Sequence, residues 1–212
     1  MSNPEEIYRL ARKPELWAPL DWAWAELDGT FGNRYDDPES RYRVLYASSQ
    51  KLGCYLETLA RFRPDPMLAT ELNQIEGEND FYPLGQVPAE WFGARLLGTA
   101  AFWGEYAEVC GNEWLSRLRS ELGPRLLAQF GIHDLDQAVL QAGAPRKLTQ
   151  MVSRAIFNAG LDGIRYPSKY GSAIENWALF EPFKIEVRRT GPIALDDPDL
   201  ARALQLLRLA IG

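Results

Sequence analysis

Three side chains in the first third of the chain have types and spacing suited to a binding and catalytic site: Arg34, Tyr46 and Glu57. An arginine binds anionic groups through charge-assisted, often bidentate hydrogen bonds. A tyrosine offers a flat face on which another ring can stack. A carboxylate can stabilise the positive charge that builds on a sugar ring as a glycosidic bond breaks. These residue types therefore suit a site that holds a charged ligand and cleaves such a bond.

A loop, a strand and a helix must position these three side chains. Turn-forming residues at 32–33 and 36–38 flank Arg34 and predict a loop there. The segment 42–47 is short and rich in aromatic and β-branched residues, which predicts a strand that carries Tyr46. A helix should follow, with Ser48 or Ser49 as its N-cap, and it should end before Pro64.

Glu57 lies off the apolar face of this predicted helix, on a stripe with Gly53 and Arg61. One interpretation is a solvated Glu57–Arg61 pair, which stabilises a helix by only a few tenths of a kcal/mol. A glycine inside a helix costs about 1 kcal/mol relative to alanine, so Gly53 indicates either a packing requirement or a close approach of another element. Ordinary interpretations also exist for the other two residues. Arg34 would pair with a nearby aspartate at 36 or 37, and Tyr46 would be a core aromatic.

Motifs along most of the chain resemble the RES domain family. They are Arg34 followed by Tyr-Asp-Asp-Pro, Val-Leu-Tyr-Ala-Ser at 44–48, the helix with Glu57, Asp-Gly-Ile-Arg-Tyr-Pro-Ser at 162–168 and Asn-Trp-Ala-Leu-Phe at 176–180. The resemblance extends from about residue 8 to residue 187. The family is named for an arginine, a glutamate and a serine, which correspond here to Arg34, Glu57 and Ser168. Many members carry an Asn-Pro-Pro-Gly-like loop after the arginine, whereas this chain has a polar insert through Tyr42.

Strands and helices that do not alternate regularly as βαβ units indicate an α+β fold. The resemblance implies an ADP-ribosyltransferase-like core of two packed mixed or antiparallel sheets flanked by helices. In that fold, NAD+ lies in a cleft between the sheets.

The resemblance also implies a role for each site residue. Glu57 would stabilise the oxocarbenium-like transition state, Arg34 would bind phosphate or ribose, and Tyr46 would stack on nicotinamide. Ser168 would hydrogen-bond the ribose or a phosphate, with Ser172 as the alternative serine. Without the resemblance, the loop 167–172 is more simply a surface loop. Arg9, on a predicted strand at 6–10, is a further NAD+-binding candidate, although a solvent-exposed edge arginine is the commoner case.

The function that the resemblance implies is NAD+ degradation by hydrolysis or phosphorolysis, as the toxin of a bacterial type II toxin–antitoxin system. NAD+ would be the substrate, and no cofactor or metal would be needed. A Xre-like antitoxin and a second copy of the chain, in a homodimer, would be its partners. One alternative is an ADP-ribosyltransferase that modifies a protein. Another is a non-catalytic interaction domain, against which the presence of Arg34, Tyr46 and Glu57 counts.

The whole sequence fits one domain over residues 1–212, with its core at about 8–187 and a C-terminal helix at about 198–211. A net charge of −6 without a long basic run argues against a broad nucleic-acid surface. No apolar run approaches membrane-spanning length, and the N-terminus does not resemble a signal peptide. The 2 cysteines favour reduced thiols and a cytoplasmic location. The single histidine, His133, excludes a multi-histidine metal site.

Several other elements can be predicted from composition and periodicity. Core packing is favoured over a partner surface for Trp17, Trp22 and Trp24. A short helix is expected over 67–76. The C-terminal helix carries a regular apolar stripe formed by Leu200, Leu204, Leu207 and Ile211.

Overall fold

The computed structural model describes residues 5–64 and 85–212. The strands are β1 (Glu5–Arg12), β2 (Val44–Ser48), β3 (Gln86–Val87), β4 (Arg95–Trp103), β5 (Tyr106–Glu108), β6 (Gly163–Ser168), β7 (Gly171–Phe180), β8 (Lys184–Pro192) and β9 (Ala210–Ile211). The helices are α1 (Lys51–Leu59), α3 (Ala89–Gly93), α4 (Asn112–Phe130), α5 (Gln137–Ala142), α6 (Arg146–Asn158) and α7 (Pro198–Leu207). Two 3-10 turns are η1 (Trp22–Trp24) and η2 (Ala60–Phe62).

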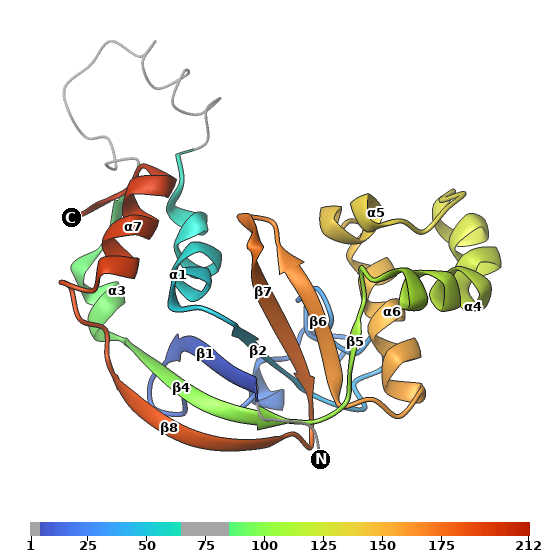
Figure 1. Cartoon of the computed structure of the whole chain (residues 1–212), viewed down its shortest axis with the longest axis horizontal. Helices are drawn as coiled ribbons and strands as arrows, with labels where there is room; N and C mark the ends of the chain where they lie inside the picture. The colour runs from blue at the N-terminus through green and yellow to red at the C-terminus, as the bar shows by residue number, and fades with distance from the viewer. Residues whose placement is uncertain (1–4, 65–84) are drawn as a thin grey trace, which may run out of the picture.

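Seven strands form one mixed sheet in the order β5-β6-β7-β2-β1-β4-β8. Its neighbouring strands are antiparallel except for the parallel pair β5 and β6. A second, two-stranded parallel sheet joins β3 to β9. Figure 1 shows a strongly curved main sheet, with α1, α3 and α7 at one end and α4, α5 and α6 at the other. The predicted α+β class is confirmed, and hydrogen bonds join the strands of the curved core into one continuous main sheet.

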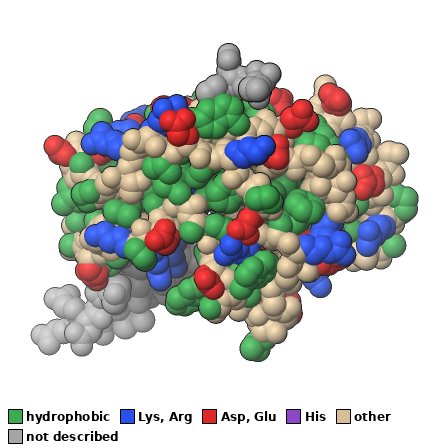
Figure 2. Space-filling view, turned by 90° about the horizontal axis from the view of Figure 1, so that it is seen from below, with side chains coloured by type: hydrophobic (Ala, Val, Ile, Leu, Met, Phe, Trp, Pro, Cys, Tyr) green, Lys and Arg blue, Asp and Glu red, His purple; other side chains and the backbone are tan. Residues whose placement is uncertain are grey.

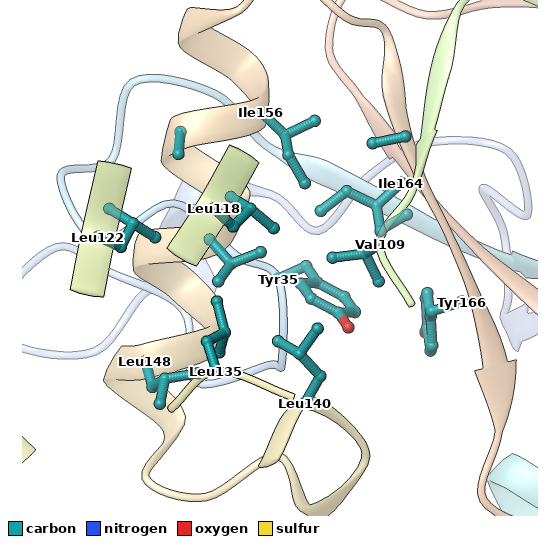
Figure 3. Packing of buried hydrophobic residues seen from close by; sticks show 14 of the residues in the cluster. Tyr35, Val109, Leu118, Leu122, Leu135, Leu140, Leu148, Ile156, Ile164 and Tyr166 are labelled. Atoms are coloured by element: carbon teal, nitrogen blue, oxygen red, sulfur yellow. The ribbon is translucent and has the colours of Figure 1, made fainter. Parts of the chain in front are cut away.

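Two buried clusters occupy opposite faces of the central strands. On one face, the curved sheet packs against itself through Ile7, Leu45, Ala47, Ala100, Phe102, Trp177 and Leu179. On the other face, α4, α5 and α6 cover a larger cluster that includes Tyr35 and Tyr166. Figure 3 shows the Tyr35 ring between Leu140 and Val109. This packing fixes the loop that carries Arg34 against the helical layer.

The start of α1 differs from the prediction. Its N-cap is Gln50, which makes no side-chain capping bond. Ser48 ends β2, and its hydroxyl donates to the carbonyl of Glu175, while the Ser49 hydroxyl accepts a bond from the Glu175 backbone N–H. Both predicted caps are therefore used to attach the β2–α1 junction to β7.

The predicted tryptophan packing is wrong for two of the three residues. Trp22 and Trp24 are 40% and 72% exposed, whereas Trp17 is partly buried and donates its ring N–H to Thr190.

The C-terminal helix also ends earlier than predicted. Arg208 has a φ of 56° and ends α7, so Ile211 pairs in β9 and does not extend the helical stripe. The helix expected over 67–76 lies outside the described residues.

The predicted loop over 167–172 is a tight hairpin in the structure. β6 continues through Ser168 and β7 begins at Gly171, so only two residues connect the strands. None of the helices within residues 5–64 and 85–212 combines the length and the hydropathy of a membrane span. The face in Figure 2 carries acidic and basic side chains interspersed, without a broad region of one sign.

Candidate functional site

The candidate site is a cleft of about 490 Å³ between the sheet, α1 and the turn that joins α5 to α6. This volume lies within the usual range of small-molecule sites. Four of the five predicted site residues line it: Arg9, Arg34, Tyr46 and Glu57. The fifth, Ser168, reaches the site through its hydrogen bond to Glu57. The fold therefore brings all five predicted residues to one place.

Three neighbouring strands form the floor of the cleft. Asn176 of β7 lies opposite Ser48 of β2 and opposite Tyr166 of β6. Side chains two positions apart on a strand share a face, so Tyr46 and Ser168 belong to the same face as this row. The floor is thus set by alternation along β2, β6 and β7.

Gly53 allows α1 to lie close to this floor. A Cβ atom at Gly53 would lie 2.1 Å from Ser48 Oγ and 2.6 Å from Ile174 Cγ2. Any larger side chain would push the helix and Glu57 away from the sheet. The close approach that the sequence indicated for Gly53 is confirmed.

Glu57 lies in α1 with one carboxylate oxygen held by two donors. The Ser168 hydroxyl and the Asn176 amide nitrogen each donate to Glu57 Oε1 over 2.8 Å. No side chain in the described residues donates to Oε2, and no ion pair joins Glu57 to Arg61 there. The carboxylate is therefore oriented at one oxygen and free at the other.

Ser168 is buried and both functions of its hydroxyl are engaged. It donates to Glu57 and accepts the Tyr170 backbone N–H over 3.1 Å. In this arrangement Ser168 positions the carboxylate. The contact to ribose or phosphate that the family resemblance implies stays a prediction. Ser172 lies in β7.

Arg34 faces the cleft without a carboxylate partner. Its guanidinium donates to the Leu140 carbonyl and lies 5.3 Å from the Tyr35 ring centre and 5.2 Å from that of Tyr166. Among the described residues, no acidic side chain lies within ion-pair distance of Arg34. Asp37 instead binds Arg154, and Asp36 accepts from Tyr46. Arg34 thus remains available to a ligand anion.

Tyr46 lines the cleft. Its hydroxyl is already hydrogen-bonded within the protein, which leaves the ring to contact a ligand. The hydroxyl donates to Asp36 Oδ1 over 2.8 Å and accepts the Tyr35 backbone N–H over 3.0 Å. Burial and the adjacent Asp36 carboxylate raise the pKa of Tyr46 well above its usual value. A neutral, fixed phenol suits ring packing better than proton transfer.

Arg9 lines the cleft, but backbone carbonyls occupy much of its guanidinium. It donates to the carbonyls of Leu16 over 2.6 Å, Tyr46 over 2.5 Å and Ala18 over 3.5 Å. Burial lowers the pKa of Arg9 to about 10, so it stays charged at neutral pH. Its first role here is to brace β2 behind Tyr46, and it adds positive charge to the cleft.

Three further lining residues were not singled out from the sequence: Arg146, Lys169 and Asn176. Arg146 begins α6, and Lys169 lies in the β6–β7 turn. With Arg9 and Arg34 they place four cations around one lining carboxylate, in a chain whose net charge is −6. A local excess of positive charge favours a ligand with several negative charges, such as a diphosphate.

Comparisons with known proteins agree with this architecture. The family model described as the RES domain matches residues 100–200, a segment that contains Ser168 and Asn176. No curated protein gives a significant match. A solved structure, described as "Crystal structure of the M.tuberculosis MbcT-MbcA toxin-antitoxin complex", contains a similar chain with a TM-score of 0.57 and 13% identity. The alignment covers 97% of this chain and 90% of that one. The predicted resemblance is confirmed: the RES domain model matches the sequence over residues 100–200, and the solved structure is similar in fold along nearly the whole chain.

Proposed function

We propose that the protein degrades NAD+ by cleaving its nicotinamide–ribose bond and acts as the toxin of a bacterial toxin–antitoxin pair. The proposal rests on the orientation and surroundings of the Glu57 carboxylate. Its Oε1 is fixed by Ser168 and Asn176, and it faces a cleft that otherwise carries cations. NAD+ combines a diphosphate with a glycosidic bond whose cleavage builds positive charge next to it. One carboxylate among several cations matches that charge pattern.

In the proposed complex, Arg34 binds the diphosphate, since its guanidinium is already oriented by Leu140 and two tyrosine rings. Arg146 and Lys169 lie at the exposed rim and add attraction at longer range. The Tyr46 ring packs on the nicotinamide. These contacts hold the ribose with its C1′ atom near Glu57.

Cleavage then follows the chemistry of glycoside hydrolysis. The bond between C1′ and the nicotinamide nitrogen breaks, and both electrons leave with nicotinamide, which becomes a neutral base. Glu57 stabilises the positive charge on the ribose, an electrostatic effect that commonly accounts for factors of about 10²–10³ in rate. A water or phosphate oxygen then forms the new bond to C1′ and loses its proton.

We also propose a protein partner. The similar solved structure is that of a toxin–antitoxin complex. For this chain we infer a Xre-like antitoxin that covers the cleft and prevents NAD+ from entering. A homodimer of the chain and a cytoplasmic location complete the proposal.

NAD+ labelled in its adenine ring tests the function and identifies the acceptor. Purified protein should convert the label to ADP-ribose in phosphate-free buffer, or to a phosphorylated ADP-ribose when phosphate is required. Label that appears only on added lysate protein would instead support an ADP-ribosyltransferase. Intact NAD+ under all these conditions would contradict catalysis.

A further inference from the structure

Asn176 is a buried side chain in the floor of the cleft whose amide is only half used. Its amide nitrogen donates to Glu57 Oε1 over 2.8 Å, whereas its carbonyl oxygen has no hydrogen-bond partner in the described residues. The residue is 3% exposed and lines the cleft. A buried polar atom without a partner is uncommon in folded proteins and needs an explanation.

The orientation of this amide follows from its neighbour. A carboxylate oxygen only accepts hydrogen bonds, so the Asn176 group that faces Glu57 must be the NH₂ group. A flipped amide would bring two acceptors together and remove one of the two donors that hold Glu57. The carbonyl oxygen is therefore directed away from Glu57, and its lack of a donor does not result from an exchanged N and O.

The surroundings of Asn176 do not supply that donor. Its neighbours across the strands are Ser48 and Tyr166, and the Ser48 hydroxyl donates to the Glu175 carbonyl. The other donor on Glu57, Ser168, is committed to the carboxylate. No donor in the described residues bonds this oxygen, and a ligand in the cleft can supply one.

We infer that the Asn176 carbonyl accepts a hydrogen bond from the 2′-hydroxyl of the nicotinamide ribose, while its NH₂ group holds Glu57. This inference rests on the proposed NAD+ cleavage. The amide places its acceptor beside the carboxylate that it orients. The 2′-hydroxyl is the ribose hydroxyl on the carbon next to C1′, where Glu57 acts. Asn176 thus fixes the distance between the reacting carbon and the carboxylate, and it selects ribose over 2′-deoxyribose.

The test compares nicotinamide release from NAD+ and from an NAD+ analogue without this 2′-hydroxyl. The ratio of kcat/KM for the two substrates is measured for the wild type, Asn176→Ala and Ser168→Ala. The analogue differs in intrinsic reactivity, but that difference affects all three proteins equally. The hydrogen bond between Asn176 and the 2′-hydroxyl is therefore detected as a difference in this kcat/KM ratio between a variant and the wild type.

Both variants remove one donor from Glu57, so both should lose activity on NAD+. Only Asn176→Ala should also lower the preference for NAD+ over the analogue, by about tenfold for one lost hydrogen bond. Ser168→Ala should keep the wild-type ratio. Circular dichroism and thermal unfolding verify the fold of each variant, and Asn176→Ser replaces Asn176→Ala if the latter does not fold.

Two results overturn the inference while leaving NAD+ cleavage intact. In the first, the wild type is active and Asn176→Ala has the same kcat/KM ratio for the two substrates as the wild type. The Asn176 carbonyl would then make no hydrogen bond to the 2′-hydroxyl. The other is loss of the preference in Ser168→Ala alone, which would assign the contact to the serine. An inactive wild type on both substrates would contradict the proposed function itself, and this inference with it.

Discussion

The residues of the cleft act through the atoms that the fold leaves free. Glu57 keeps Oε2, Arg34 keeps donors beyond the one bound to Leu140, and Tyr46 keeps only its ring face. Arg9 and Ser168 have their polar groups engaged within the protein and brace their neighbours, whereas Arg34 keeps free donors and is the residue that we propose binds the ligand anion.

Arg34→Ala should weaken NAD+ binding, because it removes a charge-assisted bond to phosphate. The expected loss is about 1.5–3 kcal/mol, or roughly ten- to hundredfold in Kd. Calorimetry in the Glu57→Gln background measures binding without turnover. Arg117→Ala is the matched control, since Arg117 is exposed on α4 and stacks on Trp114 away from the cleft. Equal affinities for the two variants would remove Arg34 from the binding site.

Cys54 should resist alkylation in the folded protein. Burial raises the pKa of its thiol to about 12, and the reactive species is the thiolate. Because the pKa of the Cys54 thiol is higher in the folded than in the unfolded state, the protonated thiol stabilises the folded state in full at pH values below the ordinary thiol pKa. This stabilisation is lost as the pH rises toward 12. Mass spectrometry after iodoacetamide treatment at pH 8 should show unmodified Cys54 in native protein and modified Cys54 in denaturant. Equal labelling of both states would contradict the burial.

Residue types and family motifs predicted Arg34, Tyr46 and Glu57, and the cleft brings these three together. Asn176 stands in the family motif at 176–180, but the sequence does not show what its side chain contacts. Arg146 carried no signal, because its place at the cleft depends on how α6 packs on the sheet. Side chains that converge through tertiary packing are not visible in a local pattern.

At the scale of elements, α1 is the piece that the site depends on most. Its apolar face and Gly53 were predictable from spacing, and both are confirmed: the apolar face is buried in a cluster with α3 and α7, and Gly53 lies against Ser48 and Ile174 of the sheet. The residue at which α1 begins was not predictable, because Ser48 and Ser49 form hydrogen bonds to β7, which is distant in sequence. The C-terminal end of α7 was likewise mispredicted, since pairing of β9 with β3 competes with helix continuation.

Gly53→Ala should destabilise the protein and reduce activity. The new methyl group would collide with Ser48 and Ile174, and such overpacking typically costs about 1–3 kcal/mol. Gly93→Ala in α3 is the matched control, because no atom lies within 4 Å of a Cβ there. Chemical denaturation should show a loss only for Gly53→Ala. Equal stability of both variants would show that α1 does not need this close approach.

For the whole molecule, the contrast is between an acidic chain and a cationic cleft. The net charge of −6 argued against a broad basic surface, and acidic and basic groups are mixed on the face in Figure 2. Composition alone could not reveal that Arg9, Arg34, Arg146 and Lys169 gather at one cleft. The α+β class was predictable from the order of elements. The continuous main sheet was not, because strand pairing is long-range.

NAD+ should stabilise the whole fold through this cleft. A ligand at 100 times its Kd stabilises the native state by about 2.7 kcal/mol. Thermal unfolding of Glu57→Gln should therefore shift upward with NAD+. At equal concentration, the shift should be much smaller with nicotinamide riboside, which lacks the diphosphate. Equal shifts for both ligands would mean that the cations do not bind phosphate.

The role of Glu57 in cleavage is tested by nicotinamide release from NAD+ by the wild type and by Glu57→Gln, measured side by side. Glutamine preserves the size of the side chain but removes its charge, so binding should persist while release falls by about 10²–10³-fold. Equal release by the two proteins would show that the charge of Glu57 takes no part in breaking the bond.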